Sequence, residues 1–246
     1  MAFGPFVFSA MKHTIWLGYE PRETNAYMVA VASIRRYWPA APIRPIILDR
    51  LRKDGLYRRD MQRHNGQIYD VISDAPMSTE FAISRFLTPI LAETGWALFM
   101  DCDMLVRCDL RDLFALADQT KAVMCVQHEH TPDRMIKMDD QIQLRYGRKN
   151  WSSVVLFNCD HPANTMLTTE LINALPGRDL HAFSWLSDAD IGELGPEWNH
   201  LVGISEPHGE PNIVHFTSGI PSMPGYADCP FSDEWREVLW RAMENL

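Results

Sequence analysis

Five consecutive apolar residues, 96–100 (WALFM), are followed directly by the acidic sequence Asp101-Cys102-Asp103. An unbroken apolar run of this length is typical of a strand buried on both faces of a parallel sheet, whereas a half-exposed strand alternates apolar and polar residues. Such a sheet needs helices on both faces, so this segment constrains the chain to an α/β fold. In open α/β sheets, ligands bind beyond the carboxyl ends of the strands, which is where the two aspartates lie.

Strand-like and helix-like segments alternate along the first half of the chain, and the second half is less regular. Apolar runs predict strands at residues 14–18, 45–48, 69–72, 96–100, 122–126, 153–157 and 213–216. Helical spacing predicts helices at 25–37, 78–93 (kinked at Pro89), 162–175 and 232–244. We therefore predict a Rossmann-like mixed sheet flanked by helices, forming a single domain over residues 14–246. Residues 1–13 are expected to be an N-terminal extension or a cloning remnant.

The charge balance limits the classes of function. Lys and Arg total 23 and Asp and Glu total 32, a formal net charge of −9. Proteins that bind the nucleic-acid backbone need a large excess of basic residues, so a general nucleic-acid-binding protein is disfavoured. A nucleic acid bound as an acceptor at one local site is still possible. The five cysteines form no CxxC pair, which argues against a zinc ribbon and a disulfide framework. No stretch reaches the ~18 apolar residues of a membrane span and the N-terminus has no basic leader, so we expect a cytoplasmic protein.

Asp101, Asp103 and His215 are the candidate metal ligands. Alternating carboxylates after a strand can both reach one hard divalent cation, which in turn can hold a diphosphate. The alternative is a turn whose carboxylates cap the next helix, but the apolar segments on either side favour the metal site. His215 follows two branched apolar residues and can add an imidazole at the end of a strand, giving a mixed oxygen and nitrogen site suited to Mn²⁺ or Mg²⁺. A lone histidine is more often simply a hydrogen-bonded polar residue.

An ordered set of motifs over residues 14–224 resembles glycosyltransferase family eight, the GT-A group that includes glycogenin-like and bacterial galactosyltransferase-like enzymes. Residues 14–27 (TIWLGYEPRETNAY) resemble its first strand and nucleotide loop, 78–91 its donor-facing helix, and 99–106 (FMDCDMLV) its DxD motif. Residues 149–157 stand in the place of its NAG segment, 187–191 and 197–200 resemble its DQD element and the WN after it, and 212–219 (NIVHFTSG) resemble the segment with the third metal ligand.

The resemblance implies a metal-dependent, retaining transfer of a sugar from a nucleoside diphosphate sugar, specifically a UDP-sugar. The acceptor is not identified: a glycan or small molecule is expected, with a nucleic acid less favoured. The implied site residues are Gly18, Tyr19, Tyr27 and Asp101 for the nucleotide; Arg85, Asn150, Ser152 and Asp188 for the donor diphosphate and sugar; and Asp101, Asp103 and His215 for Mn²⁺ or Mg²⁺. Asp188 would hydrogen-bond sugar hydroxyls and is the one candidate for a catalytic nucleophile.

Two departures from the family pattern keep alternatives open. Ala189 stands where the DQD element has glutamine, and residues 218–223 lack the lysine expected after the metal-binding histidine. A non-catalytic protein that binds nucleotide sugars or carbohydrates is therefore an alternative. A nucleotidyltransferase is a weaker one, because it should have a Gly-rich phosphate loop and residues 18–25 (GYEPRETN) contain one glycine.

Three other features each have an ordinary structural explanation, and two of them also have a functional one. His128-Glu129-His130 has metal-like spacing but is expected on a surface loop. Residues 50–64 are rich in Lys and Arg, which indicates a solvated face, or alternatively a patch for an anionic acceptor. Tryptophans usually pack in cores, and Trp151, next to Asn150, is the one best placed to stack on a sugar.

Overall fold

The computed structural model describes residues 13–64, 67–128, 148, 150–206 and 209–244. The strands are β1 (His13–Gly18), β2 (Ile43–Ile46), β3 (Met61–His64), β4 (Gln67–Asp70), β5 (Ala75–Met77), β6 (Trp96–Met100), β7 (Met104–Val106), β8 (Val123–Val126), β9 (Val154–Asn158), β10 (Ile191–Leu194), β11 (His200–Leu201) and β12 (Ile213–His215). The α-helices are α1 (Thr24–Tyr37), α2 (Leu48–Lys53), α3 (Thr88–Ala92), α4 (Leu110–Ala115), α5 (Thr169–Ala174), α6 (Gly177–His181) and α7 (Ser232–Glu244).

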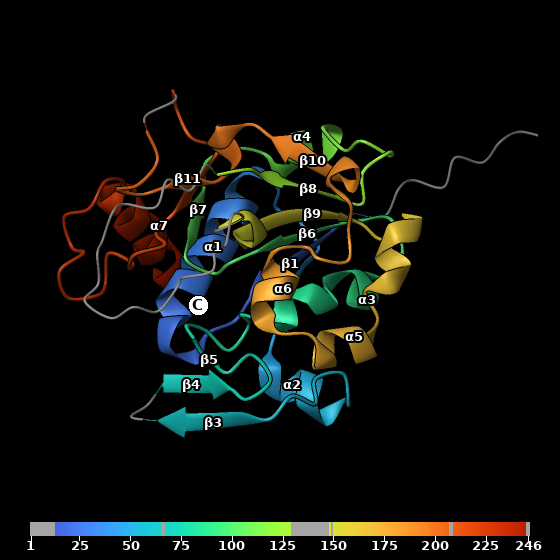
Figure 1. The fold of residues 1–246 in the computed structure, drawn as a ribbon. Coiled ribbons are helices and arrows are strands. Elements are labelled where there is room, and N and C mark those ends of the chain that lie inside the picture. Colours follow the sequence, from blue (N-terminus) through green and yellow to red (C-terminus); the bar gives the residue numbers. More distant parts are fainter. Residues whose placement is uncertain (1–12, 65–66, 129–147, 149, 207–208, 245–246) are drawn as a thin grey trace, which may run out of the picture.

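The centre of the fold is a six-stranded mixed sheet in the order β10-β8-β9-β6-β1-β2, with helices on both faces (Figure 1). The pairs β1–β2, β1–β6 and β8–β10 are parallel, and β9 runs antiparallel to both its neighbours. Two small sheets, β11-β12-β7 and β3-β4-β5, complete the described strands. The predicted mixed sheet flanked by helices is confirmed.

The run at 96–100 is apolar throughout because both faces of β6 are covered. Leu98 and Met100 are fully buried in the core that also holds residues of α4, while Ala97 and Phe99 are buried in the core that holds residues of α5 and α6. Alternate side chains of a strand point to opposite faces, so each face receives apolar side chains.

The topology brings four separate segments to one edge of the sheet. The carboxyl ends of β1 and β6 lie there, and because β9 is antiparallel its amino end lies there too. The amide of Asp101 donates to the carbonyl of Ser153 over 3.0 Å, which ties the turn after β6 to the segment before β9. β12 pairs antiparallel with β7, with His215 opposite Met104, and this brings the end of β12 to the same place.

Two predicted helices are wrong in extent. Residues 78–93 form no continuous helix: a 3₁₀ helix, Ser84–Leu87, leads into the short α3, where Pro89 occupies the first turn. Proline fits a first helical turn, where its missing N–H is not needed, so here it marks a helix start instead of a kink. Residues 162–175 split into a 3₁₀ helix, Pro162–Met166, and α5, whose N-cap is Thr168.

The boundaries of the other predicted elements agree with the structure to within a few residues. α7 matches its predicted range, and β1 begins at His13, one residue inside the expected extension. β4 lies two residues earlier than predicted because it pairs with β3, in the charged segment. No helix within the described residues combines the length and the apolar character needed to cross a bilayer.

The basic segment at 50–64 is largely neutralised by the fold. Arg59 and Asp70 form a fully buried ion pair at 2.5 Å, and Arg59 also donates to the carbonyls of Ile172 and Leu175. Arg58 pairs with Glu170 at the surface. Arg59 is therefore neither part of a solvated face nor available to an anionic acceptor.

Candidate functional site

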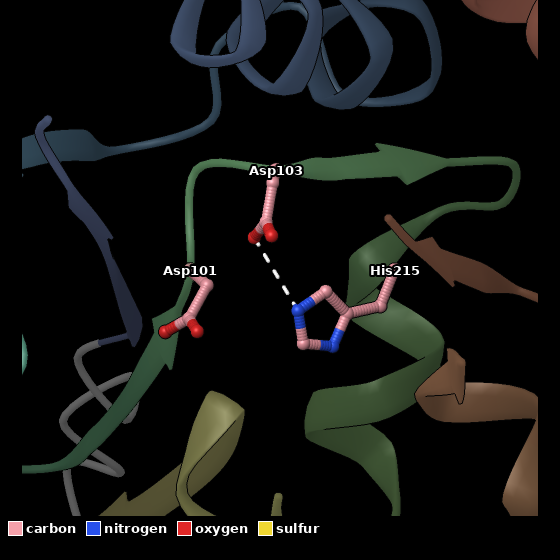
Figure 2. A group of neighbouring side chains, drawn as sticks. All are labelled: Asp101, Asp103 and His215. Atoms are coloured by element: carbon pink, nitrogen blue, oxygen red, sulfur yellow. Dashed lines mark ion pairs between the residues drawn. The ribbon is translucent and has the colours of Figure 1, made fainter. Parts of the chain in front are cut away.

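Asp101, Asp103 and His215 come together as predicted. One ligand atom from each lies within 4.8 Å of those of the other two, and Figure 2 shows the two carboxylates and the imidazole directed toward one another. Nε2 of His215 lies 3.4 Å from Asp103 Oδ1. Asp101 follows β6, Asp103 precedes β7, and His215 ends β12, so the group depends on contacts between segments far apart in the chain.

The donor set of this group fits a hard divalent cation. Oδ1 of Asp101 and Oδ1 of Asp103 are enclosed; among the described residues each contacts one basic side chain as an ion pair, Arg85 for Asp101 and His215 for Asp103. Burial raises the pKa of Asp101 to about 6, with the Asp103 charge adding to the rise and Arg85 opposing it. Burial by itself would lower the pKa of His215, but the charge of Asp103 outweighs this effect and raises the pKa of the imidazole. Enclosed carboxylate oxygens, and an imidazole nitrogen whose proton a cation can displace, are ligands that Mg²⁺ and Mn²⁺ accept.

Asn199 orients His215, a contact that the sequence analysis did not identify. Oδ1 of Asn199 lies 3.1 Å from Nδ1 of His215, and its amide group donates to Ser153 Oγ over 2.9 Å. Asn199 is fully buried. Metal-binding histidines characteristically have such a partner on the second ring nitrogen. The signal was present in the sequence, since Asn199 belongs to the Trp-Asn pair of the family resemblance.

Arg85 lies behind Asp101. Its Nη1 is 2.8 Å from Asp101 Oδ1 and also donates to the carbonyl of Ser152 over 2.8 Å. The guanidinium lies over the Phe99 ring, 4.9 Å from its centroid. The buried cation thus offsets the acidic pair and fixes Asp101 against the segment before β9.

These groups face a polar cavity of about 320 Å³. Its described lining is Glu23, Ser78, Thr79, Phe81, Arg85, Asp101, Asp103, Asn150, Ser152, Ser153, His181, His215 and Thr217. Glu23 and His181 were not predicted. Burial, reinforced by the charge of Asp103, raises the pKa of Glu23 to about 7.

Asn150 and Ser152, two of the residues expected to face the donor sugar, line the cavity. Asn150 has a left-handed backbone conformation, with φ of 65°, immediately before the 3₁₀ helix Trp151–Ser153. The hydroxyl of Ser152 lies 2.6 Å from Nδ1 of His181. The hydroxyl of Ser152 therefore has a protein partner, and the histidine stands beside it in the lining.

Of the residues expected to bind the nucleotide, Asp101 is at the cavity, whereas Gly18 at the end of β1, Tyr19 after it and Tyr27 in α1 are not among the described lining residues. Gly18 is buried, and a Cβ added there would be 2.5 Å from atoms of the Phe81 ring. The rings of Tyr19 and Tyr27 meet edge to face, with centroids 5.3 Å apart. Tyr27 lines a groove between α1 and α7. Steric closeness to Phe81 gives Gly18 a packing role that is independent of any nucleotide.

Asp188 lies outside the cavity. Its side chain is 91% exposed and forms an ion pair with Arg148. It lines a neighbouring pocket together with Gln127, Arg148, Trp151 and Ile191. Ala189 is exposed beside it, and its carbonyl accepts from Lys121. The structure thus does not bring Asp188 together with the metal ligands, and its catalytic role stays a prediction.

Three other predicted features lie partly outside the described residues. His128 is described and half-buried, and its enclosed Nε2 has no hydrogen-bond partner among the described residues, whereas residues 129 and 130 of the HxH sequence are not described. Lys149, at the start of the segment expected to face the sugar, and residues 1–12 of the expected extension are also outside the description.

The fold and the arrangement of the site define the structural class. GlyE, a glycosyltransferase of Streptococcus pneumoniae TIGR4, superposes with a TM-score of 0.59 at 16% identity over 96% of this chain and 63% of that chain, so this chain spans less than two thirds of GlyE. The galactosyltransferase LgtC, solved with donor and acceptor sugar analogues, gives a TM-score of 0.55 at 15% identity over 93% and 95% of the two chains. The bifunctional glycosyltransferase WbbM gives 0.56 at 13% identity over 96% and 53%. The chain has the GT-A glycosyltransferase fold.

The sequence comparison is closer. Protein CDI of Arabidopsis thaliana is 45% identical over 228 residues, which cover 90% of this chain and 83% of that protein. The chain belongs to the family of Protein CDI. No model of a known protein family matches the chain.

Proposed function

We propose that this protein is an enzyme that transfers a sugar from a nucleoside diphosphate sugar to an acceptor, with a divalent cation held by Asp101, Asp103 and His215. The observation that carries the proposal is the convergence of these three side chains in a polar cavity at the carboxyl edge of the sheet in a GT-A fold. The motif resemblance supports Mn²⁺ or Mg²⁺ as the cation, a UDP-sugar as the donor and retention of configuration.

The chemistry follows from the charge that develops on the leaving group. Departure of a nucleoside diphosphate leaves negative charge on the phosphate oxygens, and a bound divalent cation supplies electrostatic stabilisation there worth several kcal/mol. Asn199 keeps the Nε2 lone pair of His215 directed at the cation position, and Arg85 keeps Asp101 in place. The protein thereby fixes its ligands before the donor arrives.

Arg85 is the sole cationic side chain among the described lining residues, and it already contacts Asp101 and the carbonyls of Ser152 and Ala82. Residues 218–223 offer no lysine in its support. The divalent cation must therefore neutralise most of the diphosphate charge, and we expect donor binding to depend strictly on the metal.

The proposed site is tested by thermal unfolding with Mn²⁺, with UDP, GDP and their sugars, and with both together. A ligand present at 100 times its dissociation constant adds about 2.7 kcal/mol to the free energy of unfolding, which is a readily measured shift. We expect a metal-dependent shift that Asp103→Asn abolishes and that Asp112→Asn, an exposed carboxylate of α4, preserves. Shifts independent of the metal, or equal in both variants, would contradict the proposed site.

Ala189 and the missing lysine favour one second candidate, a non-catalytic protein that binds nucleotide sugars. Hydrolysis of the bound donor in the presence of Mn²⁺ separates the two. Donor binding with neither hydrolysis nor transfer to glycan, small-molecule or oligonucleotide acceptors would move the binding protein to first place. The acceptor and the cytoplasmic location stay predictions.

A further inference from the structure

His181 occupies a place in the cavity where the family resemblance led us to expect the Ser152 hydroxyl to act. The hydroxyl of Ser152 and Nδ1 of His181 are 2.6 Å apart, so each has a hydrogen-bond partner in the protein. The carbonyl of Ser152 is held by Arg85, which in turn contacts Asp101. His181 is thus linked to the candidate metal site through two intervening residues.

The second ring nitrogen of His181, Nε2, is available to a ligand. Nε2 forms no hydrogen bond with the residues that the structure describes, and it is absent from the set of fully enclosed polar atoms that lack a partner. It therefore retains accessible surface, and the space that this side chain lines is the cavity. A sugar hydroxyl can both donate and accept, so it suits Nε2 in either tautomer.

The imidazole is held in a fixed position by aromatic packing. The Phe86 ring meets it edge on, with centroids 5.2 Å apart, and Phe86 also packs against Phe183 and Trp185. Trp185 is anchored by a hydrogen bond from Nε1 to Asn164. A polar atom on a rigid support discriminates between ligands better than one on a flexible side chain, because less entropy is lost on binding.

The charge of the lining selects the type of sugar. Glu23, Asp101 and Asp103 are acidic, and Arg85, the described cation of the lining, already contacts Asp101. Burial keeps His181 neutral by lowering its pKa to about 3. A carboxylate on the sugar would find no free cation among these residues, whereas a hydroxyl would find Nε2.

We propose that Nε2 of His181 hydrogen-bonds a hydroxyl of a neutral sugar on the donor, which makes His181 a specificity-determining residue for the transferred sugar. This inference rests on the proposed function and adds to it the class of sugar and the atom that recognises it.

Two substitutions separate recognition from structure. Asparagine places a polar atom near the position of Nδ1, so His181→Asn can keep the contact with Ser152 and lose Nε2. Glutamine places an amide near Nε2, so His181→Gln can keep the contact with the sugar. A merely structural role would make His181→Gln the more damaging change, because it loses the Ser152 contact.

The measurement is the dissociation constant of UDP, UDP-glucose, UDP-galactose, UDP-glucuronic acid, GDP and GDP-mannose, by calorimetry with Mn²⁺. We expect His181→Asn to weaken a neutral sugar donor about fivefold more than it weakens the free diphosphate, which is the effect of one hydrogen bond. His181→Gln should lie closer to the native protein, and His161→Asn, a histidine whose Nδ1 contacts Ala163, should change neither constant.

Each other outcome is informative. Equal weakening of UDP and UDP-sugars by His181→Asn, or a native preference for UDP-glucuronic acid, would overturn the role of His181 while leaving the proposed function standing. A native protein that binds none of these ligands with Mn²⁺ would overturn both. If the variants do not fold, a crystal structure of the native protein with its donor decides: Nε2 within about 3.2 Å of a sugar hydroxyl supports the proposal, and a separation beyond hydrogen-bond reach contradicts it.

Discussion

Oδ1 of Asn199 lies 3.1 Å from Nδ1 of His215, and this contact determines which ring nitrogen carries the proton. The amide group of Asn199 faces Ser153 Oγ and the carbonyl of Asn150, so the oxygen of Asn199 is the atom that faces the imidazole. Because that oxygen can only accept, Nδ1 must carry a proton, so the proton that a binding cation displaces is the one on Nε2, which faces Asp103. The tautomer required for a metal ligand is set before any ion binds.

Asn199→Ala should therefore weaken Mn²⁺ binding by about 10–100-fold, the usual cost of losing the partner of a metal-binding histidine. Calorimetric titration with Mn²⁺ measures this directly. Asn164→Ala is the matched control, because Asn164 is also buried and bonds backbone carbonyls of Ala122 and Asn158. Both variants should lose stability, and equal Mn²⁺ affinities in the two would refute the orienting role of Asn199.

Gly18→Ala should destabilise the fold, because the added methyl group would meet the buried Phe81 ring at 2.5 Å. Overpacking of this kind costs about 1–3 kcal/mol of the free energy of unfolding. Urea denaturation gives the change, and combining Gly18→Ala with Phe81→Leu should recover part of it. A Gly18→Ala protein of native stability that has lost only nucleotide binding would instead support the direct nucleotide role expected from the sequence.

Arg59→Met should destabilise the protein by about 3–5 kcal/mol, because Asp70 would be left as an unpaired buried charge. Arg58→Met, which removes a surface pair with Glu170, should cost no more than about 1 kcal/mol. Guanidinium denaturation compares the two. Similar small losses in both variants would mean that the Arg59 pair is not buried in solution.

The pH dependence of stability should carry a contribution from His181. Its pKa is lowered from 6.5 to about 3 by burial, so between these values the unfolded chain binds a proton that the folded chain does not. The free energy of unfolding should then fall as the pH falls from about 6.5, at up to ~1.4 kcal/mol per unit.

The His181→Asn variant has no imidazole at this position to take up a proton in the unfolded chain. Its free energy of unfolding should therefore fall less steeply as the pH is lowered. Its stability deficit relative to the native protein should shrink between pH 7 and pH 4 in urea denaturation series. A deficit that is constant with pH would show that His181 is not buried as a neutral group.

Loss of transfer in Asp188→Asn is expected if Asp188 acts in the reaction as the family resemblance implies. Asp188 lies beside Arg148, outside the cavity of the metal ligands, so the structure alone gives no reason for the substitution to affect transfer. Initial transfer rates of Asp188→Asn and Asp190→Asn should differ by more than an order of magnitude, since the Asp190 carboxylate caps its own turn by accepting hydrogen bonds from Ser187. Near-native rates in Asp188→Asn would remove it from the mechanism.

The sequence by itself determined the parts of this protein that depend on local pattern. The apolar run at 96–100 predicted the central strand, helical spacing predicted α1 and α7, and the order of motifs brought Asp101, Asp103 and His215 forward as one group. The strand and helix predictions succeeded because burial on both faces of a strand leaves an unbroken apolar run, and burial on one face of a helix leaves a periodic pattern of apolar residues.

Only the tertiary structure decided what depends on pairing between distant segments. Strand β3 forms in a charged segment because Arg59 and Asp70 neutralise each other and β4 supplies hydrogen-bond partners. Asn199 and His181 are at the site because the antiparallel β9 brings Ser153 and Ser152, which they contact, to the edge where β6 ends. No local pattern carries such contacts, since each is set by the geometry between segments and not by the sequence around either residue.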